Sequence, residues 1–325
     1  MPAPTVQTLQ RLAEETGYQL GTLEKVLRLF DLLQEIASDR ILSERFVLKG
    51  GTALNAFHLG LDRLSVDIDL NYVGALDREV MLRERPNVEA ALNRLLDSHG
   101  YGVRRQPVEH AGGKWLARYA SALGGNATLE VDVNYMARQP LFGATRMNSI
   151  SLGGIRATDV PILSLEEIIA GKLVALLDRD AGRDLFDARR ILSIDDLDWE
   201  RIKAAVLAIG ASGRRDWRTM SVSEIRGETN EVRQNLTICL RHDHFADTRD
   251  INNWIEETVS LCRKRFAFLF ELTPNEQEFL DTLLDNGEID ASLLDVAPEV
   301  QELIGSMPML AWKAQHVRNY RDIST

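Results

Sequence analysis

A strand, a glycine turn, a helix and a second strand follow one another over residues 46–70, and this order constrains the fold more than any other feature of the sequence. Gly50 and Gly51 form the turn, and the second strand carries Asp67 and Asp69 between apolar neighbours. Residues i and i+2 of a strand share a face, so both carboxylates project together while the apolar side chains point into a core. The carboxylates lie about 6.6 Å apart along the strand, which suits one hard cation or a pair of cations.

The paired aspartates predict a divalent cation. Like charges on one strand face repel, and aspartate is depleted in strands, so a compensating cation is expected beside Asp67 and Asp69. Carboxylate oxygens next to phosphate favour Mg²⁺ or Mn²⁺. The alternative is a pair of solvated acids at an exposed strand edge.

The glycine turn predicts a phosphate site. Gly50 and Gly51 allow backbone N–H groups to approach an anion at the start of a helix, where the helix dipole favours negative charge. Thr52 follows the glycines and adds a hydroxyl. We therefore expect a triphosphate here, and an ordinary tight turn is the alternative.

A second strand supplies a candidate third carboxylate. Residues 129–135 alternate strictly between apolar and polar side chains, and Asp132 lies on the polar face. Asp132 is expected either to hold a second metal ion or to act as a general base, unless it is an ordinary polar-face residue. Glu130 and Asn134 share its face and are weaker candidates.

Lys172 stands within an apolar helical stripe. A capping-box pattern beginning at Ser164 predicts the start of this helix. An unpaired lysine would be costly to bury, so Lys172 should reach either a carboxylate or an anion in a cleft. Asp184 and Asp187 share one face of the next predicted helix. Lys172 either neutralises these carboxylates or binds the triphosphate and the charge that develops in the transition state.

Charge is unevenly distributed along the chain. The net charge of −11 argues against non-specific coating of nucleic acid. Residues 104–156 nevertheless carry seven basic side chains against three acidic ones, and residues 271–325 carry eleven acids against three bases. The first segment is where contact with a polyanion is expected, and scattered solvated arginines are the alternative.

The remaining composition fits an ordinary globular protein. No signal-like segment opens the sequence and no run of about 18 apolar residues occurs, so we expect a cytoplasmic protein without a membrane segment. Cys239 and Cys262 are too few and too far apart for a disulfide framework or a metal clip, and are predicted to be buried thiols.

The pattern of predicted helices and strands indicates an α+β fold. We expect N-terminal helices over residues 1–44 that pack on a catalytic core over residues 45–195. A mostly helical domain over residues 196–325 follows, in which residues 221–226 and 232–240 are predicted to form strands. A further strand is predicted over residues 115–120, and helices are predicted over residues 87–98, 199–210, 254–270, 274–285 and 291–305.

The ordered motifs of residues 45–195 resemble the AbiEii family of nucleotidyltransferase toxins, which includes the MenT proteins and belongs to the polymerase-β-like superfamily. The resemblance implies a nucleotidyltransferase-like mixed sheet flanked by helices. Five segments carry it. They are residues 46–54, 63–70, 129–133, 166–173 and 183–187.

The resemblance implies a bacterial toxin that transfers NMP from an NTP to an acceptor with Mg²⁺ (or Mn²⁺) and releases pyrophosphate. In characterised relatives the acceptor is the 3′ end of tRNA, so that translation and growth stop, with a role in abortive infection and phage defence. An AbiEi-like antitoxin encoded nearby is the implied partner. The resemblance also implies which residues of these motifs form the site. Metal ligands are Asp67, Asp69 and Asp132; nucleotide contacts are Gly50, Gly51, Thr52, Arg63, Ser65 and Lys172; catalytic residues are Asp67, Asp69, Asp132, Lys172, Asp184 and Asp187.

Two other functions remain open. In the first of these functions, the protein is still a nucleotidyltransferase, but its acceptor is a protein side chain or a small molecule. The acidic segment 271–325 would suit a cationic small substrate better than RNA. In the second, the protein is a catalytically silent module that acts by occupying a partner.

Overall fold

The computed structural model describes residues 4–106 and 112–324, with side chains up to residue 320. The chain divides into two compact units, and the division near residue 164 falls inside the segment 45–195 that was predicted to be one catalytic domain. A mixed sheet in the first unit, together with helices in both, confirms the predicted α+β class. The first unit comprises Met1–Ser164 and Gln234–Ala246, and the second comprises Leu165–Arg233 and Asp247–Thr325.

The first unit is built on a seven-stranded sheet with the order β3-β4-β5-β2-β1-β7-β6. Strand β2 runs parallel to β5 and β1 runs parallel to β7, whereas the other neighbours are antiparallel. The predicted strands correspond to β1, β2, β4 and β5, while β3, β6 and β7 were not predicted. The strands are β1 Phe46–Lys49, β2 Asp67–Tyr72, β3 Gly102–Gln106, β4 Gly112–Ala120, β5 Asn126–Asn134, β6 Ala144–Met147 and β7 Val160–Leu163.

The helices of the first unit include one that is longer than predicted. Helix α4 was expected from about residue 87, but it begins about nine residues earlier, at Arg78. The side chain of Asp77 accepts a hydrogen bond from Val80 N at 2.8 Å and caps this start. Pro86 lies inside the helix and obscured its first half, because a proline disfavours helical conformation in the residue before it. The helices are α1 Val6–Thr16, α2 Leu20–Ser38, α3 Gly50–Phe57 and α4 Arg78–Ser98, with a 3-10 turn, η1, over Leu42–Glu44.

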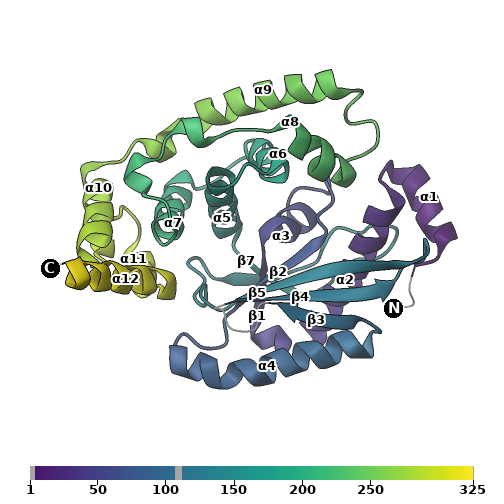
Figure 1. The fold of residues 1–325 in the computed structure, drawn as a ribbon, viewed down its shortest axis with the longest axis horizontal. Helices are drawn as coiled ribbons and strands as arrows, with labels where there is room; N and C mark the ends of the chain where they lie inside the picture. The colour runs from purple at the N-terminus through teal and green to yellow at the C-terminus, as the bar shows by residue number, and fades with distance from the viewer. Residues whose placement is uncertain (1–3, 107–111, 325) are drawn as a thin grey trace. The chain divides into compact units, whose positions relative to one another are not determined.

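Alternation along the strands gives the sheet one apolar face and one polar face. Ile68 of β2 and Val131 of β5 are fully buried on the apolar face. Trp115 of β4 is buried there as well, and its Nε1 donates a hydrogen bond to Asn93 Oδ1 of α4 at 2.8 Å. Helix α4 runs along this face, and α3 lies on the opposite one (Figure 1). The aspartates of β2 and β5 therefore project from the face that bears α3.

In its described residues, the second unit consists of helices and the segments that connect them. Helices α5, α6, α7 and α10 confirm predicted helices, and Pro298 splits the helix predicted over residues 291–305 because it occupies the first turn of α11. The α-helices are α5 Leu165–Asp178, α6 Gly182–Ile191, α7 Trp199–Ala211, α8 Thr229–Glu231, α9 Thr248–Arg265, α10 Pro274–Asp281, α11 Pro298–Gly305 and α12 Pro308–Ser324. The shorter helical turns are η2 Trp217–Thr219, η3 Val222–Glu224, η4 Val232–Leu236, η5 Thr237–Cys239, η6 Ala267–Phe270, η7 Thr282–Asn286 and η8 Ala291–Leu293.

The strands predicted over residues 221–226 and 232–240 were wrong, because both segments form helical turns. In the second segment Val232, Leu236 and Cys239 are all buried and recur at intervals of four and three residues. This is the period of a helix rather than of a strand. In the first segment a serine hydroxyl caps the 3-10 turn η3.

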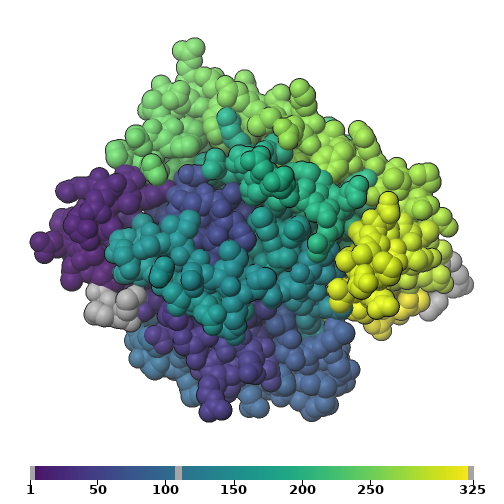
Figure 2. All heavy atoms as spheres, turned by 180° about the vertical axis from the view of Figure 1, so that it is seen from behind, coloured from purple at the N-terminus to yellow at the C-terminus, as the bar shows by residue number. Residues whose placement is uncertain are grey.

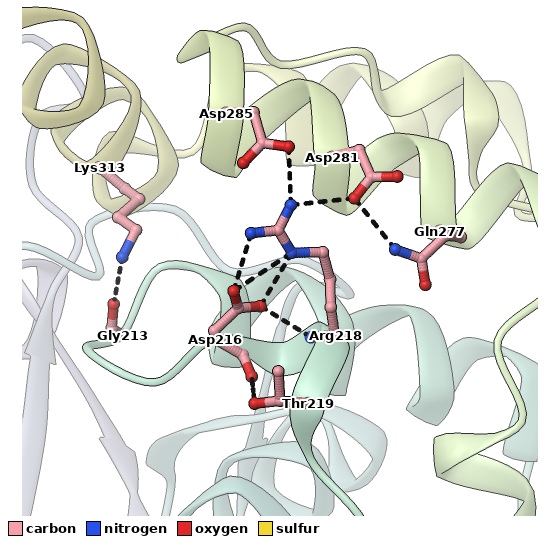
Figure 3. A network of polar contacts seen from close by, with 8 residues as sticks. All are labelled: Gly213, Asp216, Arg218, Thr219, Gln277, Asp281, Asp285 and Lys313. Atoms are coloured by element: carbon pink, nitrogen blue, oxygen red, sulfur yellow. Dashed lines mark hydrogen bonds and ion pairs between the residues drawn. The ribbon is translucent and has the colours of Figure 1, made fainter. Parts of the chain in front are cut away.

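Arg218 is the centre of a polar network within the second unit (Figure 3). Its guanidinium contacts Asp216 at 2.8 Å, Asp281 of α10 at 3.0 Å and Asp285 of η7 at 2.8 Å. The hydrogen bond from Arg218 holds the pKa of Asp216 below its usual value. Lys313 of α12 donates to the carbonyl of Gly213 at 2.9 Å. These contacts fix the segment that follows α7 against α10, η7 and α12.

Helix α12 lies at the surface of the second unit, where its yellow atoms are seen in Figure 2. Trp312 is 49% exposed and Tyr320 is 75% exposed. The rings of Trp312 and His316 lie 3.9 Å apart between centroids. The helix thus presents aromatic side chains within the acidic C-terminal segment.

Cys239 and Cys262 are both buried thiols, as predicted. Burial raises the pKa of the Cys262 thiol to about 12. Cys262 is therefore a neutral thiol at physiological pH.

Candidate active site

Strands β2 and β5 place two carboxylates side by side. Their parallel register sets Asp69 opposite Asp132, and Asp67 opposite Glu130 two residues earlier. Neighbouring strands lie about 4.8 Å apart, so side chains of paired residues leave the same face together. Burial raises the pKa of Asp132, and the negative charge of Asp69 raises it further, while Lys114 opposes both. The result is a compact group of acids on the polar face.

Gly50 makes room for Asp69. Its φ of +72° lies in the left-handed region, which glycine adopts without strain. A Cβ at this position would overlap the Asp69 carboxylate, at 3.0 Å from Cγ and 3.1 Å from Cβ. Gly50 is also the first residue of α3, so the first turn of this helix starts beside Asp69. The glycine is needed both for the turn and for the approach of the carboxylate.

Thr52 links α3 to β2 through a side-chain hydrogen bond. Its hydroxyl donates to the backbone carbonyl of Asp67 at 2.6 Å, and the residue is 1% exposed. Asn55, one turn later, donates to the carbonyl of Gly51 at 3.0 Å. The Thr52 hydroxyl, predicted to contact a triphosphate, thus sets the position of the glycine turn relative to the strand.

The two polar residues that precede β2 are both buried. Arg63 is 1% exposed and donates from Nη1 to the carbonyl of Leu64 at 3.1 Å. Ser65 is 9% exposed and stands two residues before Asp67. The Leu64 amide donates to the carbonyl of Cys239 at 2.8 Å, which holds this segment in place. Arg63 and Ser65 are thus buried just before β2, and their predicted contact with the nucleotide stays a prediction.

Lys114 lies beside the acidic group. From the sequence it was only one of the seven basic residues of segment 104–156. Strand β4 sets it opposite Asp132. Its Nζ donates to Glu130 Oε2 at 2.7 Å and lies 3.3 Å from Asp132 Oδ2. The signal that would have found it is the glycine pair Gly124-Gly125, because a hairpin turning there pairs the two strands in this register.

The other basic residues of that segment differ in where they lie. Arg105, Arg138 and Arg146 donate to partners within the first unit. Arg118 is exposed, and its place on β4, four residues after Lys114, puts it on the same sheet face. Contact with a polyanion stays a prediction, for which Arg118 and Arg104 of β3 are both exposed on this face.

The described residues contain no group of three or more His, Cys, Asp and Glu side chains arranged to hold a metal ion. Mg²⁺, however, commonly binds through one or two carboxylates and completes its octahedron with substrate phosphates and water. Asp69 and Asp132 are paired oxygen donors, and the absent Cβ of Gly50 lets the Asp69 carboxylate lie against the first turn of α3. The residues present fit a divalent cation that arrives with a nucleotide.

Lys172 forms a buried ion-pair cluster within the second unit. Its Nζ lies 3.1 Å from Asp184 Oδ1 and 2.8 Å from Asp187 Oδ2. Both aspartates are almost fully buried, and Arg179 also pairs with Asp184 at 2.7 Å. Burial alone would raise the pKa of Asp184, but the charges of Lys172 and Arg179 lower it overall. Lys172 was predicted to reach either a carboxylate or an anion in a cleft, and in this cluster it reaches two carboxylates.

The sequence model of the family described as nucleotidyl transferase AbiEii toxin, type IV toxin–antitoxin system, matches residues 31–296, which is most of the chain. The chain belongs to the AbiEii toxin family. As a member of this family it is a nucleotidyltransferase toxin with an NTP as substrate and an antitoxin as partner.

A solved structure supports the fold of this AbiEii protein. MenT4, a nucleotidyltransferase toxin from Mycobacterium tuberculosis H37Rv, is similar with a TM-score of 0.61 and 19% sequence identity. The similarity covers 94% of this chain and 99% of that one. No curated protein sequence matches the chain. Among the described helices, none combines the length and apolar character needed to cross a membrane.

Proposed function

We propose that this AbiEii protein transfers NMP from an NTP to the 3′ end of tRNA in a Mg²⁺-dependent reaction. Blocking the tRNA end would stop translation and growth, as expected of a cytoplasmic abortive-infection toxin neutralised by an AbiEi-like antitoxin. The observation that carries the proposal is the register of Asp69 with Asp132 beside Gly50. Acids and a helix N-terminus on one face suit a cation and a triphosphate.

In this proposal the first unit binds the nucleotide. The backbone N–H groups of Gly50 and Gly51 donate to phosphate oxygens at the start of α3. Thr52 keeps this turn against β2 through its bond to Asp67. Asp67, Asp69 and Asp132 supply the oxygen ligands of the cation. When bound, Mg²⁺ would neutralise phosphate charge and lower the pKa of the acceptor hydroxyl.

The reaction itself is a displacement at the α-phosphorus. The acceptor hydroxyl oxygen forms the new P–O bond, the bond to the β-phosphate oxygen breaks, and pyrophosphate leaves. The hydroxyl proton passes to a carboxylate of the acidic group or to water. Asp132 suits this role only where it does not hold the cation; it is half-buried beside another acid, and a general base must lie within hydrogen-bond reach of the proton.

Lys172 is proposed to contribute through its third N–H donor. An ammonium group has three donors, and Asp184 and Asp187 take two of them. The family resemblance assigns Lys172 a contact with a nucleotide phosphate, and for the second unit taken by itself this role stays a prediction.

The acceptor is tested with purified protein, Mg²⁺, each labelled NTP in turn and bulk tRNA. The expected result is label in tRNA with one preferred NTP, located at the 3′ end by sequencing of the modified RNA. The absence of label from RNA with all four NTPs would overturn the tRNA proposal.

A second acceptor class is favoured by the acidic segment 271–325, whose eleven acids against three bases suit a cationic small molecule or protein. Label that survives ribonuclease and stays with a protein or small-molecule fraction would establish it. Growth arrest that persists in an Asp67→Ala, Asp69→Ala double variant would instead indicate a silent binding module, since such arrest needs no metal chemistry.

A further inference from the structure

One row of residues crosses the sheet on its polar face. The strand registers set Lys49 of β1 opposite Asp69 of β2, Asp69 opposite Asp132 of β5, and Asp132 opposite Lys114 of β4. Residues paired in this way project from the same face of neighbouring strands. The row therefore reads lysine, aspartate, aspartate, lysine across four strands, with the two acids flanked on both sides by cations.

Lys114 is engaged with acids on its own side of this row. Its Nζ is closer to Glu130, at 2.7 Å, than to Asp132, at 3.3 Å. The side chains of Lys114, Glu130 and Asp132 are 41%, 40% and 38% exposed. Ion pairs this open to water contribute only about 0.2–1 kcal/mol, so the contact to Asp132 is replaceable at small cost. The hydrogen bond to Glu130 would still hold the ammonium if the contact to Asp132 were lost.

We propose that Lys114 is a resident counter-cation of the acidic group. In the metal-free protein its ammonium offsets the negative charge of Asp132, and it gives up Asp132 when a divalent cation binds between Asp69 and Asp132. Lys114 is then a positioning residue that stays on Glu130 and competes with the metal for Asp132. This inference rests on the proposed metal-dependent function, and it adds that the metal must displace an internal cation.

The test measures Mn²⁺ binding to the full chain by electron paramagnetic resonance of the free ion. Lys114→Met removes the competing charge but keeps the aliphatic stem, and is expected to bind Mn²⁺ about three- to fivefold more tightly, the ratio that corresponds to a surface ion pair of up to about 1 kcal/mol. Lys114→Arg keeps the charge and should bind as the wild type does. Arg146→Met is a matched control, because Arg146 is 44% exposed in the same unit and pairs with Asp159.

Thermal unfolding gives a second readout that does not depend on activity. Without metal, Lys114→Met should melt below the wild type because its acids lack a counter-charge, and Mn²⁺ should raise its melting temperature more than that of the wild type. Lys114→Gln replaces Lys114→Met if the latter does not fold. If Lys114→Met binds Mn²⁺ no more tightly than the wild type does, while the wild type still binds Mn²⁺ and transfers NMP, this inference is overturned and the proposed function is not. Failure of every form to bind Mn²⁺ overturns the proposed function together with it.

Discussion

Gly50 is the residue on which the geometry of the acidic group depends most directly. Its positive φ and its closeness to the Asp69 carboxylate are separate requirements, and a glycine meets both. Gly100 has nearly the same φ, +76°, but an added Cβ there would meet nothing within 4 Å. Comparing substitutions at Gly50 and Gly100 therefore separates the effect of backbone strain from the effect of contact with the Asp69 carboxylate.

Gly50→Ala and Gly100→Ala are each expected to lower the free energy of unfolding by about 1–2 kcal/mol, the cost of the left-handed conformation for an L-residue. Only Gly50→Ala should also lose nucleotidyl transfer, because its Cβ displaces Asp69. Urea unfolding and the initial rate of labelled NTP incorporation measure the two effects. Equal transfer rates in the two variants would refute the role assigned to Gly50.

At the scale of elements, α5 and α6 are joined by the cluster of Lys172, Asp184 and Asp187. Removing the cation from a buried cluster leaves carboxylates without compensation, which typically costs about 3–5 kcal/mol. Lys172→Met should lower the free energy of unfolding by an amount in this range, as measured by chemical denaturation. Lys264→Met on the exposed surface of α9 is the control and should change stability by less than about 0.5 kcal/mol.

The same cluster makes a prediction about pH. The pKa of Asp184 is lowered in the folded protein, so its stabilisation is complete above the unfolded pKa of about 3.9 and is lost as the pH falls through the lower folded value. In Lys172→Met the folded pKa rises, and acid unfolding should begin at higher pH than in the wild type. Circular dichroism between pH 7 and pH 3 measures both curves; coinciding acid limbs would contradict the assignment.

Local patterns were sufficient for the elements that carry the candidate site. The alternation around Asp69 and Asp132 and the glycine turn before α3 are short-range signals, and the strands and the helix formed where they indicated. The pairing of Lys114 with Asp132 was not predicted, because register depends on the hairpin that joins β4 and β5. The strands β1, β6 and β7 have four residues each, which is too short for alternation to stand out, and β1 was recognised from the glycine turn that follows it.

Helical turns were harder to predict than long elements. The buried spacing of Val232, Leu236 and Cys239 was taken for a strand because β-branched and apolar residues are common to both. Which residues are buried decides the period, and burial depends on tertiary packing. Likewise, Lys172 was recognised as needing a partner, but only packing decides which charges reach it.

For the whole molecule, family membership over residues 31–296 establishes nucleotidyl transfer and leaves the acceptor to the proposal. The charge distribution bears on that proposal, because the acidic group and Arg118 lie on one sheet face while the C-terminal segment is strongly acidic. The chemistry is therefore assigned to the first unit's polar face, and the claim rests on Asp69 and Asp132 acting as a pair.

The most direct test is the single-turnover rate of NMP transfer in Asp69→Asn compared with Asp159→Asn. Both substitutions remove one carboxylate from the first unit, but Asp159 is 70% exposed and pairs with Arg146. Losing a carboxylate that supports the reacting phosphate is worth several kcal/mol, so Asp69→Asn should slow transfer by at least about 100-fold while Asp159→Asn keeps the wild-type rate. A folded Asp69→Asn protein that transfers as fast as the wild type would contradict the account.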